Sequence, residues 1–156
     1  MRQGAFHGPD SGTAGKFMSE STDPKLAEIA NKLCIGSFYR HVLLCIGETC
    51  CDSETGNAAW ELLKRLLKDH QLSLSTAPGA CYRTKVGCLR VCIQGPILVV
   101  YPEGTWYANM TVERIPRFVQ EHLIEGREIP EWIFARNPLP LVQESAPRIE
   151  LPRSDG

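Results

Sequence analysis

A length of 156 residues, with 43% hydrophobic and 22% charged residues, suits one compact domain with tails and excludes a disordered chain. The formal net charge of −1 offers no field that would attract nucleic acid or an anionic membrane, so we expect neither as a partner. No stretch approaches the roughly 18 apolar residues that are needed to cross a bilayer.

The N-terminal residues and the cysteines together indicate a cytoplasmic protein. Residues 1–22 are rich in Gly, Ser and Thr, lack the apolar core of a secretory signal, and are predicted to be disordered, with Met18 as a second candidate start. Seven cysteines without such a signal are expected to stay reduced. Cysteines clustered in a reducing compartment are more often metal ligands or catalytic groups than disulfide partners.

The spacing of apolar residues predicts alternating helices and strands. Asp23-Pro24 is a typical helix start, and apolar residues at i, i+3, i+4 and i+7 continue the helix to about Leu33. Residues 23–39 are therefore expected to form a helical extension that packs on the body. The elements predicted after it are a strand at 41–45, a helix around 59–67, strands at 81–86, 96–101 and 105–108, and a helix from Thr111 to Gly126.

This order of elements is typical of a thioredoxin-like α/β fold. It reads β-α-β and then β-β-α, with the helix between the second and third strands reduced to a loop. We predict a four-stranded mixed sheet with flanking helices over residues 40–126, preceded by the N-terminal helix. Residues 127–156 are rich in proline and are predicted to lie along the body as an extended tail.

Four cysteines follow the ends of two strands that are predicted to be neighbours. Cys45 and Cys50 form a C-x4-C pair that leaves a strand, and Cys88 and Cys92 form a C-x3-C pair in a loop flanked by glycines. Loops at the same end of adjacent parallel strands can bring four thiolates together, as an iron–sulfur cluster requires. The pattern therefore indicates a metal centre.

Other interpretations of the cysteines remain open at this point. Buried thiols without a function are the simplest one, and we expect this state for Cys34 and Cys81. A zinc site is another, although zinc ligands usually follow C-x2-C spacing, which neither pair has. A dithiol enzyme would need a C-x-x-C motif, which the chain lacks, and no acid–base pair is visible, so we expect no enzyme activity. A zinc-binding or metal-free interaction module, with Trp132-Ile-Phe134 contacting a partner, is the alternative function.

The chain resembles the thioredoxin-like [2Fe-2S] ferredoxins over about residues 41–126. The residues that carry the resemblance are His41-Val-Leu-Leu-Cys45, Cys50, Gly87-Cys88-Leu-Arg-Val-Cys92, Gly95-Pro96 and Val99-Val-Tyr-Pro-Glu-Gly-Thr-Trp-Tyr107. The resemblance implies one [2Fe-2S] cluster and a one-electron carrier that serves redox partner proteins. The ligands that it implies are Cys45, Cys50, Cys88 and Cys92. Because the family includes dimers, a homodimer is a further expected arrangement.

Two features depart from the usual family pattern or add to it. The short C-x4-C spacing looks more like the small iron–sulfur subunit of respiratory NADH:quinone oxidoreductase, which shares this fold. Cys51 directly follows Cys50, so either could be the second ligand, and the family spacing favours Cys50.

Arg90 lies between two of the predicted ligands, where its charge would offset an anionic cluster. Arg83 and Lys85 have the same expected role or lie on a solvated strand face.

Overall fold

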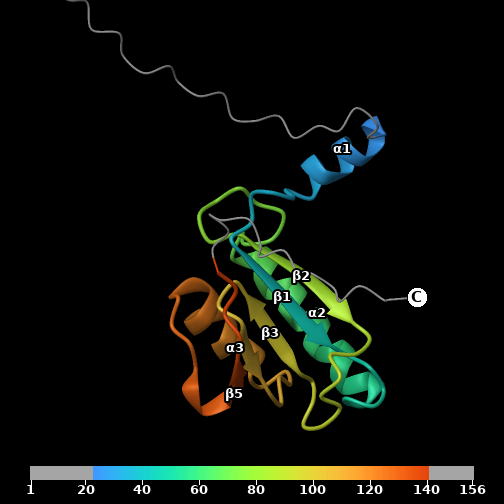
Figure 1. Ribbon diagram of the computed structural model, residues 1–156, viewed down its shortest axis with the longest axis vertical. Helices are drawn as coiled ribbons and strands as arrows, with labels where there is room; N and C mark the ends of the chain where they lie inside the picture. Colours follow the sequence, from blue (N-terminus) through green and yellow to red (C-terminus); the bar gives the residue numbers. More distant parts are fainter. Residues whose placement is uncertain (1–22, 141–156) are drawn as a thin grey trace, which may run out of the picture.

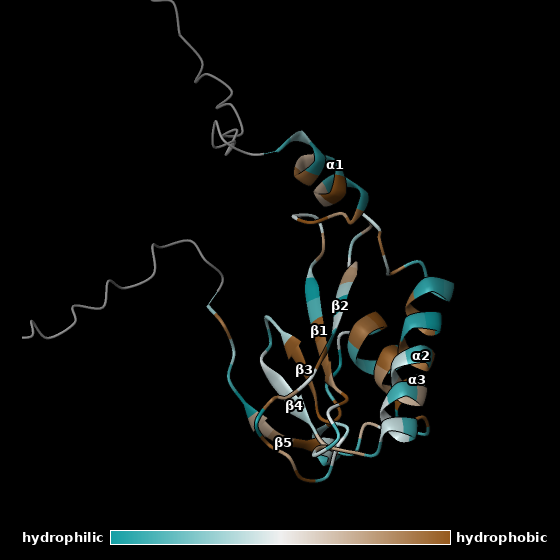
Figure 2. Ribbon diagram, turned by 90° about the vertical axis from the view of Figure 1, so that its right-hand side faces the viewer, coloured by the Kyte–Doolittle hydropathy of each residue, from teal (hydrophilic) through white to brown (hydrophobic). Residues whose placement is uncertain are grey.

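The computed structural model describes residues 23–140, in which a mixed sheet of five strands carries helices on one of its faces (Figures 1 and 2). The strands, in the sheet order β2-β1-β3-β4-β5, are β2 (Cys81–Val86), β1 (Arg40–Cys45), β3 (Leu98–Tyr101), β4 (Thr105–Tyr107) and β5 (Ile133–Arg136). The helices are α1 (Pro24–Lys32), α2 (Ser53–Asp69), α3 (Ile115–Phe118), the π-helix η1 (Val119–Ile124) and the 3-10 helix η2 (Pro130–Trp132). Of the strand pairs in the described part of the chain, only β1 and β2 are parallel. Among residues 23–140, no helix has the length and apolar content that crossing a membrane requires.

The predicted thioredoxin-like fold class is confirmed, and the sheet has one more strand than expected. The β1-α2-β2 unit and the β3-β4 hairpin lie where the periodicity predicted them. The additional strand β5 comes from the segment predicted as an extended tail, and it pairs antiparallel with β4. The sequence alone did not reveal β5, because this four-residue segment forms a strand through its hydrogen bonds with β4 and not through a local pattern of its own. The rest of the predicted tail, residues 141–156, and the segment 1–22 lie outside the described residues.

Helix α1 forms where the sequence predicted it, but it does not pack on the body. The Asp23 side chain accepts a hydrogen bond from the Lys25 N–H at 2.9 Å, which caps the first turn. No residue of α1 is buried, and Leu26 and Ile29 are 59% and 49% exposed. Both figures show α1 standing away from the sheet. The expected packing is therefore wrong, because no described element covers the apolar stripe of this helix.

The last helix begins later than predicted. Residues 111–114 form a turn, in which the Arg114 N–H donates to the Thr111 carbonyl oxygen, and α3 starts at Ile115. A helix from Thr111 would place Pro116 in its interior, where proline lacks the N–H for an i→i−4 bond and clashes with the preceding turn. In the structure Pro116 lies in the first turn, where neither cost arises.

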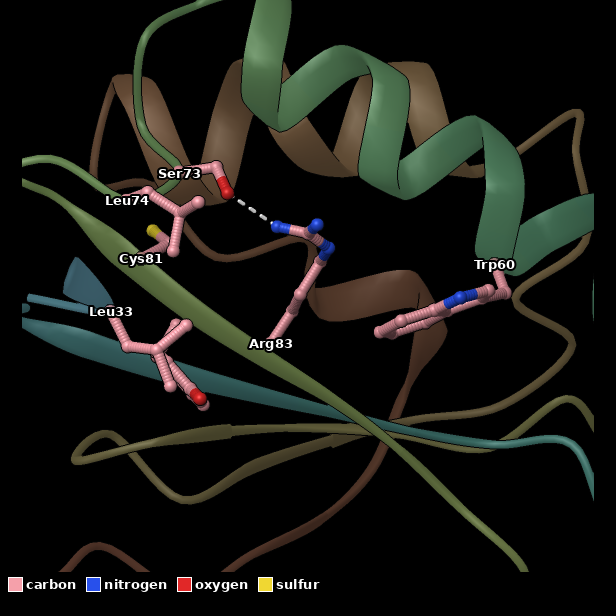
Figure 3. Close-up of a pocket in the computed structure, with 7 residues that line it drawn as sticks. Leu33, Trp60, Ser73, Leu74, Cys81 and Arg83 are labelled. Atoms are coloured by element: carbon pink, nitrogen blue, oxygen red, sulfur yellow. Dashed lines mark hydrogen bonds between the residues drawn. The ribbon is translucent and has the colours of Figure 1, made fainter. Parts of the chain in front are cut away.

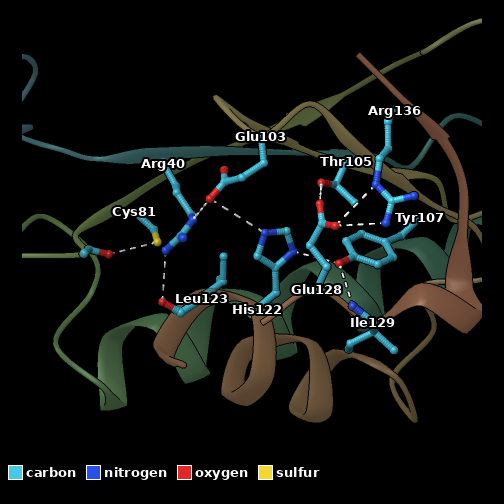
Figure 4. A network of polar contacts seen from close by, with 11 residues as sticks. Arg40, Cys81, Glu103, Thr105, Tyr107, His122, Leu123, Glu128, Ile129 and Arg136 are labelled. Atoms are coloured by element: carbon cyan, nitrogen blue, oxygen red, sulfur yellow. Dashed lines mark hydrogen bonds and ion pairs between the residues drawn. The ribbon is translucent and has the colours of Figure 1, made fainter. Parts of the chain in front are cut away.

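A buried polar network crosses the core from Tyr107 in β4 to Arg40 at the start of β1, which is the end of that strand opposite the cysteine loops (Figure 4). Tyr107 and His122 are almost fully buried, and the Tyr107 hydroxyl lies 2.8 Å from His122 Nδ1. The Ile129 N–H donates to the same hydroxyl at 3.2 Å. On its other side, His122 Nε2 lies 3.9 Å from a carboxylate oxygen of Glu103, which Arg40 binds at 2.5 Å. The network ties the start of β1, the turn between β3 and β4, strand β4 and η1 together.

Acid is expected to destabilise this fold through His122. Burial lowers the pKa of His122, Glu103 opposes the change, and Arg40 adds to it. The unfolded chain therefore binds this proton at a higher pH than the folded chain. The contribution of the neutral His122 side chain to the free energy of unfolding is complete above about pH 6.5. It falls at lower pH, by at most about 1.4 kcal/mol per pH unit. We expect His122→Gln to lose less thermal stability than the wild type between about pH 7.5 and about pH 5.5.

The comparison with wild type separates the effect of His122 from that of His41, which is half-buried. Burial also lowers the pKa of His41, so His41 adds to the acid sensitivity of both proteins equally. The measurement is the midpoint of thermal unfolding, followed by circular dichroism at the two pH values. An equal fall in the midpoint of both proteins would contradict the prediction.

Candidate metal centre

The structure brings the four predicted ligands to one end of the sheet. Cys45 is the last residue of β1, and Cys50 follows in the loop that leads to α2. Cys88 and Cys92 lie in the loop between β2 and β3. Because β1 and β2 are parallel, both loops leave the sheet at the arrowhead ends of these strands in Figure 1. The C-x4-C and C-x3-C pairs are therefore neighbours, as their spacing predicted.

The first pair faces the protein interior. Cys45 and Cys50 are 1% and 8% exposed. The Cys45 N–H donates to the Ile97 carbonyl at 2.8 Å, and a turn closed by the Cys50 N–H and the Gly47 carbonyl orients the second thiol. Burial raises the pKa of the Cys50 thiol to about 11; the Ile97 backbone opposes this rise and the nearby Cys45 thiol adds to it. The Cys50 thiol is therefore protonated without a cation and would be deprotonated by a bound metal.

The second pair faces solvent, and its sulfurs lie close together. Both Cys88 and Cys92 are exposed, and their sulfurs are 3.8 Å apart. Two thiolates on one tetrahedral metal, with bonds of about 2.3 Å, are separated by about 3.8 Å. The Arg90 N–H donates to Cys88 Sγ at 3.1 Å, so the backbone already supplies a hydrogen bond to this sulfur. The spacing fits two ligands of one iron.

The loop that holds the second pair has an unusual backbone. Arg90, Cys92 and Gln94 all have positive φ, at 65°, 52° and 53°. Non-glycine residues adopt this left-handed conformation rarely, and such residues often occur at functional sites. The alternation folds the loop back on itself so that both sulfurs face the same side. Sequence reasoning missed it because the left-handed positions carry neither Gly nor Asn, which usually mark them.

Glycines allow the two cysteine loops to touch. A Cβ atom on Gly47 would lie 1.9 Å from the Gly87 carbonyl oxygen, and one on Gly95 would lie 2.3 Å from Cys50 Sγ. The Thr49 hydroxyl also donates across the loops to Cys92 Sγ at 3.5 Å. The close approach of backbones is the role in which glycine has no substitute.

Cys50 and Cys51 point in different directions. The space beside Gly95, in the second cysteine loop, is occupied by Cys50 Sγ. Cys51 Sγ lies 2.9 Å from where a Cβ on Gly56 would be, against the first turn of α2. Burial raises the pKa of Cys51, and Cys45 and Asp52 add to the rise. Of the two adjacent thiols, Cys50 is the one that contacts the second cysteine loop, at Gly95.

The basic residues near the cysteines have separate surroundings. Arg90 and Lys85 are exposed, and the contact of Arg90 with Cys88 is made by its backbone. Arg83 is half-buried beside Trp60, on the face of β2 that points to α2. Cys34 and Cys81 lie apart from the four thiols, and Cys81 donates to the Gly79 carbonyl oxygen at 3.2 Å. Cys81 is buried, as expected, whereas Cys34 is half-exposed.

The donor set fits a two-iron cluster. Such a cluster uses four thiolates, two on each iron, whereas a single structural zinc ion needs four donors around one point. Within residues 23–140, no three His, Cys, Asp or Glu side chains surround one point at metal-binding distance. The cysteines instead lie as two pairs, on loops whose glycines let them approach.

Comparisons with known proteins give the same assignment. No family model matches the chain. A 2Fe-2S ferredoxin of Aquifex aeolicus (strain VF5) is 24% identical over 110 residues, which are 65% of this chain and 95% of that protein. A protein of Priestia megaterium assigned as a 2Fe-2S ferredoxin is 33% identical over 94 residues, which are 60% of this chain and 68% of that protein.

A comparison with solved structures also points to the thioredoxin-like ferredoxins. The solved structure of a thioredoxin-like [2Fe-2S] ferredoxin from Aquifex aeolicus aligns with a TM-score of 0.55 and 22% identity, over 66% of this chain and 96% of that one. The predicted kinship with the respiratory subunit stays a prediction. The sequence relatives and the shared fold together show that this chain belongs to the thioredoxin-like [2Fe-2S] ferredoxins.

Proposed function

We propose that this chain holds one [2Fe-2S] cluster on Cys45, Cys50, Cys88 and Cys92 and carries single electrons between redox proteins. The observation that carries the proposal is the meeting of two cysteine pairs at one end of the sheet, with 3.8 Å between the sulfurs of the outer pair. Membership in the ferredoxin family supports the same function. The chain acts as a carrier and has no catalytic activity of its own.

The two pairs have different tasks. When bound, the cluster supplies reversible one-electron chemistry. The buried pair, Cys45 and Cys50, excludes water from the inner side of the site. The exposed pair, Cys88 and Cys92, leaves the outer side open to a partner. The Arg90 N–H and the Thr49 hydroxyl donate to the outer sulfurs, which stabilises negative charge there and raises the reduction potential.

The directions of the adjacent thiols support Cys50 as the second ligand. Its sulfur faces Gly95 in the second cysteine loop, while the sulfur of Cys51 faces α2. In this arrangement Cys51 is a neighbour of the site and leaves the ligand set unchanged.

We place the carrier in the cytoplasm, with redox proteins as its partners. All seven cysteines lie within the described residues, and none of them forms a disulfide, which suits a reducing compartment. Donor and acceptor are redox proteins that reach the exposed pair. A homodimer stays a prediction.

The zinc-binding or metal-free interaction module has less support. Two separate cysteine pairs suit two irons better than one zinc ion. The segment proposed to bind a partner also has an internal role. Trp132 packs against the guanidinium groups of Arg114 and Arg117, at 4.9 and 4.8 Å from the ring centroid, and Phe134 belongs to β5.

The test is spectroscopy on anaerobically purified protein. We expect a red-brown protein with equal amounts of iron and acid-labile sulfide, visible absorption that bleaches with dithionite, and an EPR signal in the reduced state. A chain that stays colourless after reconstitution with iron and sulfide would refute the proposal.

A further inference from the structure

The outer edge of β2 is an unpaired edge of the sheet. Within residues 23–140, β2 is the first strand in the sheet order, and only β1 pairs with it. The Val86 carbonyl accepts from Ile46 on the β1 side, whereas the Cys81 N–H donates outward to the Leu72 carbonyl at 2.8 Å. The backbone N–H and C=O groups of successive residues in a strand point alternately to the two neighbouring sides. Like Cys81, Arg83 and Lys85 therefore direct their N–H and C=O groups outward. Among the described residues, Leu72 therefore pairs with the start of this edge, and no backbone group pairs with its middle.

A cavity lies beside the free edge (Figure 3). Its volume is about 200 Å³. Small-molecule sites usually measure about 300–1,000 Å³, so this cavity is closer to the size of one side chain. The residues that line it are Leu33, Trp60, Ser73, Leu74, Cys81, Tyr82 and Arg83.

The charged group in the cavity, the Arg83 guanidinium, makes no direct ion pair within residues 23–140; the charge of Glu61, which pairs with Lys64, acts on it without contact and raises its pKa against the lowering by burial. Figure 3 shows the Arg83 side chain reaching from β2 towards Ser73, whose hydroxyl accepts a hydrogen bond from the guanidinium. The Trp60 ring lies on the other side, 5.7 Å from the guanidinium carbon. Within the described residues, the buried Arg83 Nε has no hydrogen-bond partner, and Arg83 makes no ion pair. Partly buried arginines are normally paired, and their planar fork matches a carboxylate.

We propose that an extended segment of a redox partner pairs with the outer edge of β2 and places an Asp or Glu carboxylate on Arg83. The partner's backbone would continue the line of hydrogen bonds that Leu72 begins. Leu33 and Leu74 provide apolar walls beside the carboxylate. The partner's identity as a redox protein rests on the proposed function, because β2 runs through Gly87 directly into Cys88.

Charge makes a second copy of this chain a poor occupant of the same edge. Two β2 strands that paired antiparallel would bring Arg83 and Lys85 of one copy opposite those of the other. Like charges directly opposite each other destabilise a strand pair. Lys85 is exposed and makes no ion pair within residues 23–140, so an acidic segment meets two unpaired positive charges here.

The experiment is an NMR titration of the oxidised, ¹⁵N-labelled holoprotein. The probes are two blocked peptides, acetyl-Thr-Val-Glu-Val-Thr-amide and its counterpart with Gln in place of Glu. The readouts are the Arg83 Nε–H signal, assigned by its loss in Arg83→Lys, and the backbone amides of Arg83 and Lys85. We expect the Glu peptide to shift all three signals and to bind about tenfold more tightly than the Gln peptide.

A matched pair of variants separates the site from general electrostatics. Arg83→Gln and Arg65→Gln remove the same charge, but Arg65 lies on an exposed part of α2 outside the cavity. Arg83→Gln is expected to abolish the preference for the Glu peptide, and Arg65→Gln is expected to keep it. An unchanged cluster absorption spectrum shows that each variant is folded.

Three outcomes would overturn the inference. One is equal binding of the two peptides, and another is an unchanged preference in Arg83→Gln. The third is a shift of the Arg83 signal by butyrate alone as large as that by the peptide, without movement of the β2 amides, because the cavity would then serve a free acid. Failure of the proposed function is seen separately, as absence of the iron–sulfur absorption before any peptide is added.

Discussion

Alanine at any one of Cys45, Cys50, Cys88 and Cys92 is expected to cause near-complete loss of the iron and sulfide bound by this protein. Each iron of a [2Fe-2S] cluster uses two cysteine thiolates, and alanine leaves one position without a donor. The sulfurs of Cys88 and Cys92 are 3.8 Å apart and are expected to bind the same iron. Loss of either one would leave that iron with a single cysteine ligand. The measurement is iron and sulfide per chain after anaerobic reconstitution, together with visible absorption.

The matched controls are the three remaining cysteines. Cys34→Ala and Cys81→Ala are expected to keep the full iron and sulfide content, because neither residue lies at the cysteine loops. Cys51→Ala is expected to keep it as well, since the Cys51 sulfur faces α2. A variant Cys50→Ala with a normal cluster, beside a Cys51→Ala protein without one, would reverse the assignment of the second ligand.

Gly47→Ala is expected to have the second largest effect, because it would force the two cysteine loops apart. A Cβ at this position would lie 1.9 Å from the Gly87 carbonyl oxygen, and a backbone atom can move away only if its loop moves. Overpacking of this kind costs about 1–3 kcal/mol, and separation of the loops would also separate the cysteine pairs. We expect loss of most of the cluster and a lower thermal midpoint, measured by iron content and circular dichroism.

The control for Gly47→Ala lies on the other side of the same contact. A Cβ on Gly87 would meet no atom within 4 Å, and no left-handed φ constrains this glycine. Gly87→Ala is therefore expected to keep both the cluster and the stability of the wild type. If the two variants behaved alike, contact between the loops would not be what holds the cysteine pairs together.

These variants probe the site at two levels. The cysteine series tests which atoms bind iron, and the glycine pair tests how the fold brings those atoms together. The exposure of the cysteines adds a functional asymmetry. The pair on the β1 side is buried and the pair after β2 is open to solvent, whereas the cavity beside β2 lies at the start of that strand, at Cys81 and Arg83.

Several features of the fold and the site followed from local sequence signals. Apolar periodicity located α2 and the strands β1 to β4, because burial on one face imposes its period on the sequence. Asp23-Pro24 marked the start of α1 through capping. The cysteine spacing indicated one shared site, since parallel strands must send their loops to the same end of a sheet.

Other features depended on contacts between distant segments. Strand β5 forms by pairing with the edge of β4. No residue of helix α1 is buried by the other described elements. The late start of α3 was encoded by Pro116, although the cap signal at Thr111 pointed to an earlier start.

The sequence by itself determined the fold class and the residue types that can bind iron, because these depend on periodicity and spacing along the chain, and the resemblance of its motifs to the thioredoxin-like ferredoxins indicated the family. Only the tertiary structure decided that Cys50 contacts Gly95 while Cys51 contacts Gly56 and that Arg90 contacts Cys88 through its backbone. It also decided that Arg83, beside a sheet edge, makes no ion pair with any other residue of 23–140. The direction of a side chain and the absence of a partner depend on which distant segments pack around it. No local pattern of residues carries that information.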